Sequence, residues 1–374
     1  MVTRIIRAAT AALLTTTALA QTWSSCNPLS SSSCPADTAL GMSIHVDFTQ
    51  GSVNSFVASG GTPSYTSSGA DFTVSKSGDA PQLTSVFYIM FGRVEFTMKS
   101  APGAGIVSSL VLQSDDLDEI DMEWLGGDNN QVQTNYFGKG QTTTYNRGQF
   151  NPAANNQGQY LTYTIDWTAD RIVWSVGGTV VRTLKYADAE TGQYPQTPMQ
   201  VKFGAWSGGD SSNAAGTIQW AGGPTDYSKG PFTMSVQSVV ITDYSTGKNY
   251  KYGDTSGSWQ SIVAEDGKVN GNLGKAGIQT ITATAAAATG SSGAAPTVPV
   301  GGIGSGDTAT QTGWPWTSTN TANANPIPSG WRMTPEGKLI PISGAASVKM
   351  PHLVLLIGPV MLGCMAAFAG RWRI

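Results

Sequence analysis

The sequence contains very little histidine, cysteine or charge. Its 374 residues include 2 His and 3 Cys, and only 12% of them are charged. His352 adjoins an apolar C-terminal run, so the rest of the chain carries a single imidazole, that of His45. A Ser-His-Asp triad and a zinc site built from imidazoles both need histidines that this chain can hardly supply. His45 alternates with the apolar residues of an expected strand, and we interpret it as structural. No metal site and no cofactor are predicted.

Positive charge is equally scarce. The chain has 21 Lys and Arg against 24 Asp and Glu. Five of the positive charges lie in terminal segments that we expect to be removed: Arg4, Arg7, Lys349, Arg371 and Arg373. The remainder then has 16 positive and 24 negative groups, a net charge of −8. An acidic chain without a cluster of Lys and Arg has no surface that attracts nucleic-acid phosphates, which excludes nucleic acid as a partner.

The N-terminus has the pattern of a secretory signal. Arg4 and Arg7 precede an apolar run over Ala8–Leu14, and a small-x-small cleavage pattern follows at Ala18–Ala20. This order of charge, apolar run and cleavage site predicts a signal peptide over residues 1–20. The protein is therefore expected to be secreted.

The C-terminus has the layout of a membrane attachment signal. Small residues at 343–347 and a short spacer precede the 17-residue apolar run Leu353–Ala369. This layout predicts a GPI-attachment signal over residues 344–374, with Ser343 or Gly344 as the attachment residue. The basic end at Arg371–Ile374 departs from such signals, and a retained single membrane span fits it too. Both alternatives place the main domain outside the cell, tethered to its surface.

The cysteines predict one disulfide. Cys364 lies in the apolar tail, which leaves Cys26 and Cys34 as a pair in an N-terminal segment over residues 21–39. In an exported protein such an even pair is expected to be oxidised, closing a small loop.

A stalk is predicted over residues 266–343. Between Lys275 and Arg332 the one charged residue is Asp307, and most of the others are Ala, Thr, Ser, Gly and Pro. Such a segment cannot bury enough apolar surface to offset the entropy lost on ordering. Its composition indicates a disordered, O-glycosylated spacer between the main domain and the membrane.

Residues 40–265 have the pattern of an all-β domain. Short runs rich in Val, Ile, Thr, Tyr, Phe and Trp are separated by Gly, Ser, Asn and Asp, and no stretch keeps a helical period. We predict an antiparallel β-sandwich. The expected strands are Ser43–Phe48, Asp71–Val74, Phe87–Lys99, Ile106–Gln113, Glu119–Leu125, Tyr160–Trp167, Arg171–Val176, Thr179–Leu184, Met199–Trp206 and Phe232–Thr242.

Acidic residues concentrate at one place, residues 115–123, which hold six of the 24. From Glu119 onward they alternate with apolar residues, so Glu119, Asp121 and Glu123 are expected on one face of a strand and the apolar residues on the other. Residues four apart on a strand have Cα atoms about 13 Å apart. Two Glu side chains that lean together approach the carboxyl spacing of about 5 to 5.5 Å of retaining glycosidases, against about 6.5 to 9.5 Å in inverting enzymes.

Crowding is also expected to give the three acids different protonation states. Three carboxylates on one strip cannot all ionise easily, so at least one is expected to stay protonated near neutral pH. Glycosyl transfer with retention needs one carboxylate that attacks and one acid that donates a proton. A solvated acidic face and a calcium site are the alternatives. Like charges on one face disfavour the first, and the regular apolar alternation disfavours the second.

The segment Asp118–Trp124 resembles the catalytic signature Glu-x-Asp-x-Glu of glycoside hydrolase family 16. Further segments resemble the Crh branch of that family, the fungal chitin-glucan transglycosylases of the cell wall: Phe87–Arg93, Gly105–Ser109, Leu112–Asp116 and Gly216–Gly223. Gln133–Asn135 and Tyr163–Trp167 are similar to segments of the plant xyloglucan endotransglycosylases. The resemblance covers about residues 40–245 and implies a concanavalin-like β-jelly roll.

The resemblance also implies roles for individual residues. Glu119 is expected to be the nucleophile, Glu123 the general acid and then base, and Asp121 an assisting residue that hydrogen-bonds the nucleophile. Gln133 and Asn135 match positions that bind sugar hydroxyls. Two tryptophans, Trp206 and Trp220, fall in segments that line the cleft, although a place in the sandwich core is an equal alternative for each.

The resemblance favours a monomeric cell-wall transglycosylase. Its donor is expected to be chitin and its acceptor β-glucan or chitin, and a membrane is expected as a partner through the anchor alone. In a hydrolase of the same fold, water attacks the intermediate in place of a sugar hydroxyl. The sequence does not decide between transglycosylase and hydrolase. A carbohydrate-binding wall protein is the alternative outside enzymes, since jelly rolls also serve as lectins.

Overall fold

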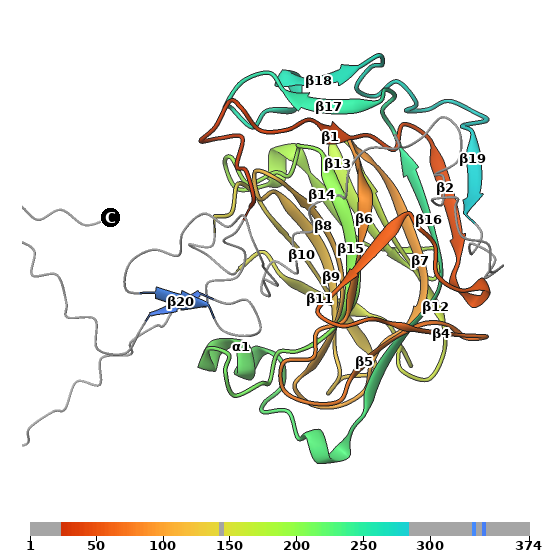
Figure 1. The fold of residues 1–374 in the computed structure, drawn as a ribbon, viewed down its shortest axis with the longest axis vertical. Helices are drawn as coiled ribbons and strands as arrows, with labels where there is room; N and C mark the ends of the chain where they lie inside the picture. Colours follow the sequence, from red (N-terminus) through yellow and green to blue (C-terminus); the bar gives the residue numbers. More distant parts are fainter. Residues whose placement is uncertain (1–23, 142–145, 284–330, 334–338, 342–374) are drawn as a thin grey trace, which may run out of the picture.

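The computed structural model describes residues 24–141, 146–283, 331–333 and 339–341. Two large β-sheets pack face to face, with a small sheet at one end and a short helix at the other (Figure 1). The predicted signal peptide over 1–20, the attachment residues Ser343 and Gly344 and the tail over 344–374 lie outside the described residues. Within the described ranges, no helix has the length and apolar character needed to cross a membrane.

The first large sheet has seven strands in the order β11-β10-β9-β8-β15-β6-β3, and every neighbouring pair is antiparallel. Its strands are β3 (Phe56–Ser59), β6 (Gln82–Ile89), β8 (Ile106–Ser114), β9 (Glu119–Leu125), β10 (Gln131–Phe137), β11 (Gln149–Pro152) and β15 (Met199–Ser207).

The second large sheet has nine strands. Seven follow the order β14-β13-β12-β7-β16-β2-β19, and β5 joins β16 with β4 beside it. The strands are β2 (Ser43–Asp47), β4 (Ser64–Thr66), β5 (Gly69–Val74), β7 (Gly92–Lys99), β12 (Leu161–Trp167), β13 (Arg171–Val176), β14 (Thr179–Lys185), β16 (Phe232–Asp243) and β19 (Thr280–Ala283).

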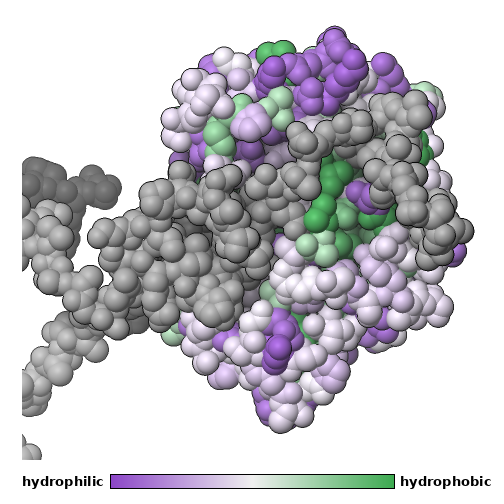
Figure 2. Space-filling model, in the orientation of Figure 1, coloured by the Kyte–Doolittle hydropathy of each residue, from purple (hydrophilic) through white to green (hydrophobic). Residues whose placement is uncertain are grey.

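Smaller elements complete the described chain. A three-stranded sheet joins β1 (Asp37–Thr38), β17 (Asn249–Tyr252) and β18 (Ile262–Glu265), and a separate pair joins β20 (Trp331–Met333) to β21 (Leu339–Pro341). The helices are α1 (Ala215–Trp220) and the 3-10 turns η1 (Phe48–Gln50), η2 (Tyr186–Asp188), η3 (Tyr227–Lys229) and η4 (Trp259–Ser261). Figure 2 shows a hydrophilic surface around β17 and β18, and there Lys248 pairs with Asp266 and Lys251 with Glu265.

The hydrophobic core lies between the two large sheets. Alternate residues of each strand enter it, because successive side chains of a strand point to opposite faces. Phe203 of β15 packs against Phe96 of β7 with ring centroids 4.8 Å apart, and Trp124 of β9 packs against Tyr163 of β12 at 4.6 Å. Each such buried side chain stabilises the fold by about 1.5 to 3 kcal/mol. The predicted all-β jelly-roll sandwich is confirmed, with β19 and β2 as its one parallel strand pair among the described residues.

The two ends of the described domain differ in how well the sequence predicts them. Cys26 and Cys34 form the expected disulfide. The prediction that the stalk begins at residue 266 is wrong, because the domain continues to Ala283. Asn272 donates hydrogen bonds to the carbonyls of Gly41, Asp243 and Ser245, and β19 then pairs with β2. Strand pairing uses backbone groups, so a composition poor in large apolar residues did not prevent it. β20 and β21 also pair inside the predicted stalk.

Candidate active site

Strand β9 presents its three acids on the face of the seven-stranded sheet that points away from the core. Ile120, Met122 and Trp124 alternate with them and belong to the core cluster. Glu119, Asp121 and Glu123 therefore share the opposite face, as the alternation of the sequence predicts. All three are at most 4% exposed, which argues against a solvated acidic face.

The two neighbouring strands bring polar side chains to the same face. On β8, Gln113 is opposite Glu119 and Ser109 is opposite Glu123. On β10, Asn135 is opposite Asp121 and Gln133 is opposite Glu123. Residues directly opposite on antiparallel strands have Cβ atoms about 4.5 to 5.5 Å apart. Gln133 and Asn135, identified in the sequence as sugar-binding candidates, therefore flank the acids.

Glu123 accepts a hydrogen bond from a neutral donor. The Oγ of Ser109 donates to its Oε1 at 3.0 Å, and the indole Nε1 of Trp206 donates to Ser109 Oγ at 3.0 Å. Burial raises the pKa of Glu123 well above its usual value, and the charge of Asp121 raises it further, while the hydrogen bond from Ser109 lowers it. The balance favours the protonated form that a general acid requires.

Glu119 accepts a hydrogen bond from an amide held by a buried cation. The Nε2 of Gln113 donates to Oε2 of Glu119 at 3.1 Å, and Lys202 Nζ donates to Gln113 Oε1 at 2.8 Å. Burial raises the pKa of Glu119 well above its usual value, and Asp121 and Glu123 add to the rise. Lys202 acts in the opposite direction and lowers it.

Asp121 lies between the two glutamates. The side chains of Asp121 and Glu119 form a hydrogen-bonded pair, which raises the pKa of Glu119 and lowers that of Asp121. Burial raises the pKa of Asp121 to about 7, while Glu119 and Arg182 lower it. The crowding predicted from the sequence therefore applies to all three acids.

The two candidate tryptophans pack outside the sandwich core. Trp206 and Trp220 stack with ring centroids 6.1 Å apart and an angle of 25° between the rings. They belong to a second apolar cluster with Val107 and Val111 of β8, on the same face as the acids. Trp220 also donates from Nε1 to Oε1 of Gln133 at 3.0 Å. A place in the main core, the alternative considered for both residues, is not what the structure shows.

Four residues near the acids were not identified from the sequence: Ser109, Gln113, Lys202 and Phe150. Ser109 and Gln113 sit on a predicted strand, but their place beside the acids depends on the pairing of β8 with β9. Lys202 lies 89 residues from its partner Gln113, so no local pattern links them. Phe150 of β11 is opposite Gln133 and 45% exposed, a large apolar ring left in solvent on the sheet of the acids.

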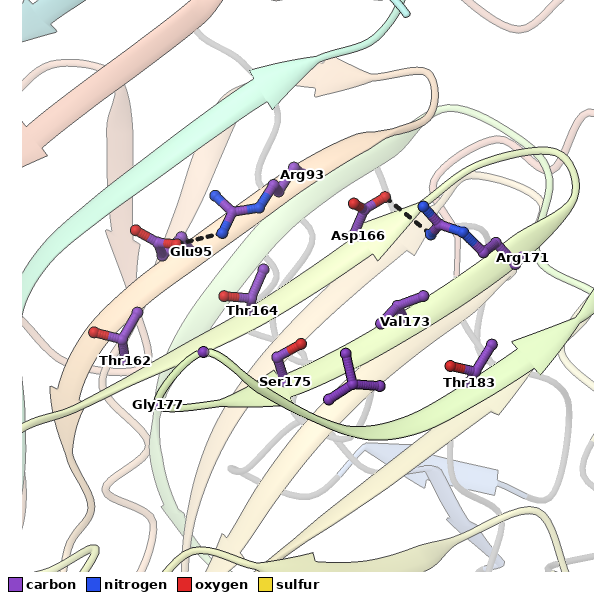
Figure 3. A pocket seen from close by; sticks show the side chains of 12 residues that line it. Arg93, Glu95, Thr162, Thr164, Asp166, Arg171, Val173, Ser175, Gly177 and Thr183 are labelled. Carbon is purple, nitrogen blue, oxygen red and sulfur yellow. Dashed lines mark hydrogen bonds and ion pairs between the residues drawn. The ribbon is translucent and has the colours of Figure 1, made fainter. Parts of the chain in front are cut away.

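A hollow of about 720 Å³ lies on the other large sheet, over β7, β12, β13 and β14 (Figure 3). Its lining includes the ion pairs Arg93–Glu95 and Asp166–Arg171, with threonines between them. Its lining contains no aromatic residue and none of the acids of β9. This hollow is therefore separate from the acids, which lie on the seven-stranded sheet. Among the residues that the structure describes, no group of three or more His, Cys, Asp or Glu is arranged to hold a metal ion.

Comparison with known proteins gives the same family as the resemblance found in the sequence. Residues 40–222 match the family described as glycosyl hydrolases family 16. The chain is 61% identical to Crh-like protein 4 of Botryotinia fuckeliana (strain B05.10) over 98% of both chains. It is 57% identical to Crh-like protein 4 of Aspergillus fumigatus, covering 70% of this chain and 58% of that one.

A solved structure agrees as well. The Crh5 transglycosylase in complex with NAG is 53% identical, with a TM-score of 0.63, and the match covers 64% of this chain and 100% of that chain. The chain therefore belongs to the glycosyl hydrolases of family 16 and, within them, to the Crh-like proteins.

Proposed function

We propose that the protein is a retaining transglycosylase of the fungal cell wall that cleaves β-1,4-linked chitin and transfers it to β-glucan or chitin. The observation that carries the proposal is the strip Glu119, Asp121 and Glu123 on one face of β9, with a hydrogen-bond donor from β8 beside each glutamate. The relative named a transglycosylase, whose structure contains NAG, supports the reaction and the amino-sugar donor.

The reaction runs in two steps. Glu119 attacks the anomeric carbon and forms a glycosyl ester, while Glu123 gives its proton to the departing sugar oxygen. In the second step Glu123, now ionised, removes the proton from an acceptor hydroxyl, and that oxygen displaces Glu119. Two displacements at one carbon restore the original anomeric configuration.

Gln133 and Asn135 are expected to bind donor hydroxyls, since both project from β10 beside the acids. Trp220 is partly buried and stacks on the buried Trp206, and it supplies apolar surface on the same face, where a sugar ring can stack. The hydrogen bond from Trp220 to Gln133 fixes the side-chain amide of Gln133 in one orientation.

Location follows from the termini. The signal over 1–20 and the tail over 344–374, with attachment at Ser343 or Gly344, are expected to export the domain and tether it to the cell surface as a monomer. Both polymers are insoluble and lie outside the plasma membrane, so an enzyme that joins them needs this location.

A product assay tests the function. The purified protein is incubated with chitin oligomers and a labelled glucan acceptor, and the products are identified by mass spectrometry. Labelled hybrids support transfer, whereas hydrolysis products alone indicate a hydrolase, and sugar binding without any cleavage indicates a lectin. Glu119→Gln and Glu123→Gln are each expected to reduce turnover by about 10²- to 10⁴-fold with the fold intact. Normal turnover in either variant contradicts its role.

A further inference from the structure

Two series of side-chain hydrogen bonds, here called relays, connect the neighbouring strands β15, β8 and β9, and each ends at one of the two glutamates. The first relay runs from Lys202 through Gln113 to Glu119, with donor-acceptor distances of 2.8 and 3.1 Å. The second relay runs from Trp206 through Ser109 to Glu123, with distances of 3.0 and 3.0 Å. Each starts on β15, passes through β8 and ends on β9 at the residue directly opposite the β8 member. The two glutamates are thus supported by the same arrangement, four residues apart.

Both relays begin at a group that only donates hydrogen bonds. A lysine ammonium has three donors and no acceptor, and an indole Nε1 is a donor alone. Lys202 therefore orients Gln113 with Oε1 toward β15 and Nε2 toward Glu119. Trp206 likewise occupies the Ser109 oxygen as an acceptor and leaves the hydroxyl proton for Glu123. Because the first group of each relay cannot accept a hydrogen bond, every bond in the relay points toward the glutamate, which therefore accepts one.

The two relays differ in charge. Lys202 is 1% exposed, and burial lowers its pKa to about 8, while Asp115 and Glu119 act to raise it. The relay to Glu119 therefore carries a positive charge at neutral pH and below. The charged groups that act on Glu119 are Asp121 and Glu123 of its own strand and Lys202 of β15. The members of the relay to Glu123 are a hydroxyl and an indole, which are neutral.

We propose that Lys202, acting through Gln113, is a positioning residue that aims Glu119 as the nucleophile and favours its ionised form, while the neutral Trp206–Ser109 relay lets Glu123 carry the proton. The inference rests on the proposed function and adds to it a physical reason why the two glutamates have different roles. It assigns a reaction-specific task to a buried lysine that the acid motif does not include.

The first test uses the ligand-free protein, so that it does not depend on any substrate. The pKa of the Glu119 carboxyl is measured by carboxyl infrared or ¹³C titration, with Glu119→Gln identifying the signal. In Lys202→Met the pKa of Glu119 is expected to rise, because the cation that lowers it is gone. An unchanged pKa of Glu119 in a folded Lys202→Met protein overturns the proposal, whether or not the protein is a transglycosylase.

The second test measures cleavage of chitin oligomers against pH. Lys202→Met is expected to reduce kcat by about 10- to 100-fold at neutral pH, as for loss of a charge-assisted contact, and to move the acid limb of the profile to higher pH with little change in KM. Equal loss of kcat across all pH values, or a rise in KM alone, indicates a merely structural lysine and overturns the proposal.

A third variant covers the case in which Lys202→Met does not fold. Gln113→Ala removes the donor to Glu119 while Lys202 stays in place. It is expected to move the acid limb to higher pH by less than Lys202→Met does, because the charge of Lys202 still acts on Glu119. Where the double variant folds, its shift is expected to be smaller than the sum of the two single shifts, because the two residues act in one relay. A Gln113→Ala protein with the wild-type acid limb contradicts the relay.

Discussion

Ser109 of β8 faces Glu123 of β9 and donates a 3.0 Å hydrogen bond to its carboxyl group. This bond lowers the pKa of Glu123, against burial and the charge of Asp121, which raise it. In Ser109→Ala the pKa of Glu123 is therefore expected to rise, and the alkaline limb of the pH profile of kcat moves to higher pH. The loss of one hydrogen bond is expected to reduce kcat by about 2- to 10-fold at the optimum.

The measurement is the pH dependence of chitin-oligomer cleavage. Ser109→Thr keeps a hydroxyl on the same strand and serves as the matched control, with an alkaline limb near that of the wild type. If the alkaline limb of the kcat profile moves to lower pH in Ser109→Ala, the hydrogen bond from Ser109 does not lower the pKa of Glu123 as argued.

Phe150 is expected to support a sugar ring beside the acids. It lies on β11 across from Gln133, on the face of the sheet that carries Glu123, and 45% of its surface is exposed. Phe150→Ala is expected to raise KM for long chitin oligomers by about 2- to 10-fold with kcat nearly unchanged, as for loss of one aromatic contact. Tyr186→Ala is the matched control, since Tyr186 is 52% exposed and follows β14 of the other sheet. Equal KM values in the two variants contradict a role for Phe150.

Lys139 is expected to stabilise the fold in a pH-dependent way. Its Nζ lies 2.7 Å from Asp118 Oδ2 and 3.2 Å from Asp116 Oδ2, and both carboxylates are fully buried. Burial raises the pKa of Asp118 to about 6, Asp116 adds to the rise, and Lys139 lowers it. With a raised pKa, the stability that Asp118 contributes is complete below its unfolded value of about 4 and is lost as the pH rises through about 6.

Lys139→Met removes the compensating cation. The loss of unfolding free energy is expected to be about 3 to 5 kcal/mol at pH 7, where Asp118 is ionised, and smaller at pH 4, where Asp118 is protonated. Urea unfolding at the two pH values measures it. Lys248→Met is the control, because the Lys248–Asp266 pair is largely exposed and such pairs contribute about 0 to 1 kcal/mol. A Lys139→Met deficit that is equal at both pH values contradicts this interpretation.

Phe203 is expected to be the most sensitive position of the core. Its ring packs against four other phenylalanines, at centroid distances of 4.8 to 5.8 Å: Phe48, Phe56, Phe72 and Phe96. Phe203→Ala is expected to cost about 3 to 5 kcal/mol of unfolding free energy. Leu273→Ala, at a residue that is 45% exposed in a turn, is expected to stay within about 0.5 kcal/mol. Chemical denaturation compares the two, and similar losses contradict the packing argument.

The sequence predicts the catalytic strand well because its signal is local. Glu119–Leu125 forms β9 with the bounds that the alternation indicates, and its apolar residues enter the core. The sequence fails where conformation depends on distant contacts. Phe87–Lys99 was predicted as one strand but is divided into β6 and β7, with Phe91 at φ 59° between them. A left-handed conformation in an aromatic residue has no sequence signal, because such residues rarely adopt it.

Strand β10 and Lys202 illustrate the same limit. Gln131–Phe137 contains few large apolar residues and was not predicted as a strand, although it carries both sugar-binding candidates. Lys202 was not selected because nothing near it in the chain indicates a buried cation; its partner Gln113 comes from another strand. Pairing between strands, which no single sequence specifies directly, brings these groups to the acids.

The three acids and the donors that hold the two glutamates all lie on β15, β8 and β9, in the middle of the seven-stranded sheet. Phe150 on the border strand β11 and Trp220 at the end of α1 lie at the margins of that arrangement. If the acids act as proposed, substitutions at Phe150 or Trp220 are expected to change which sugars bind without moving the acids or their donors. Substrate preference and bond cleavage would then be able to vary separately.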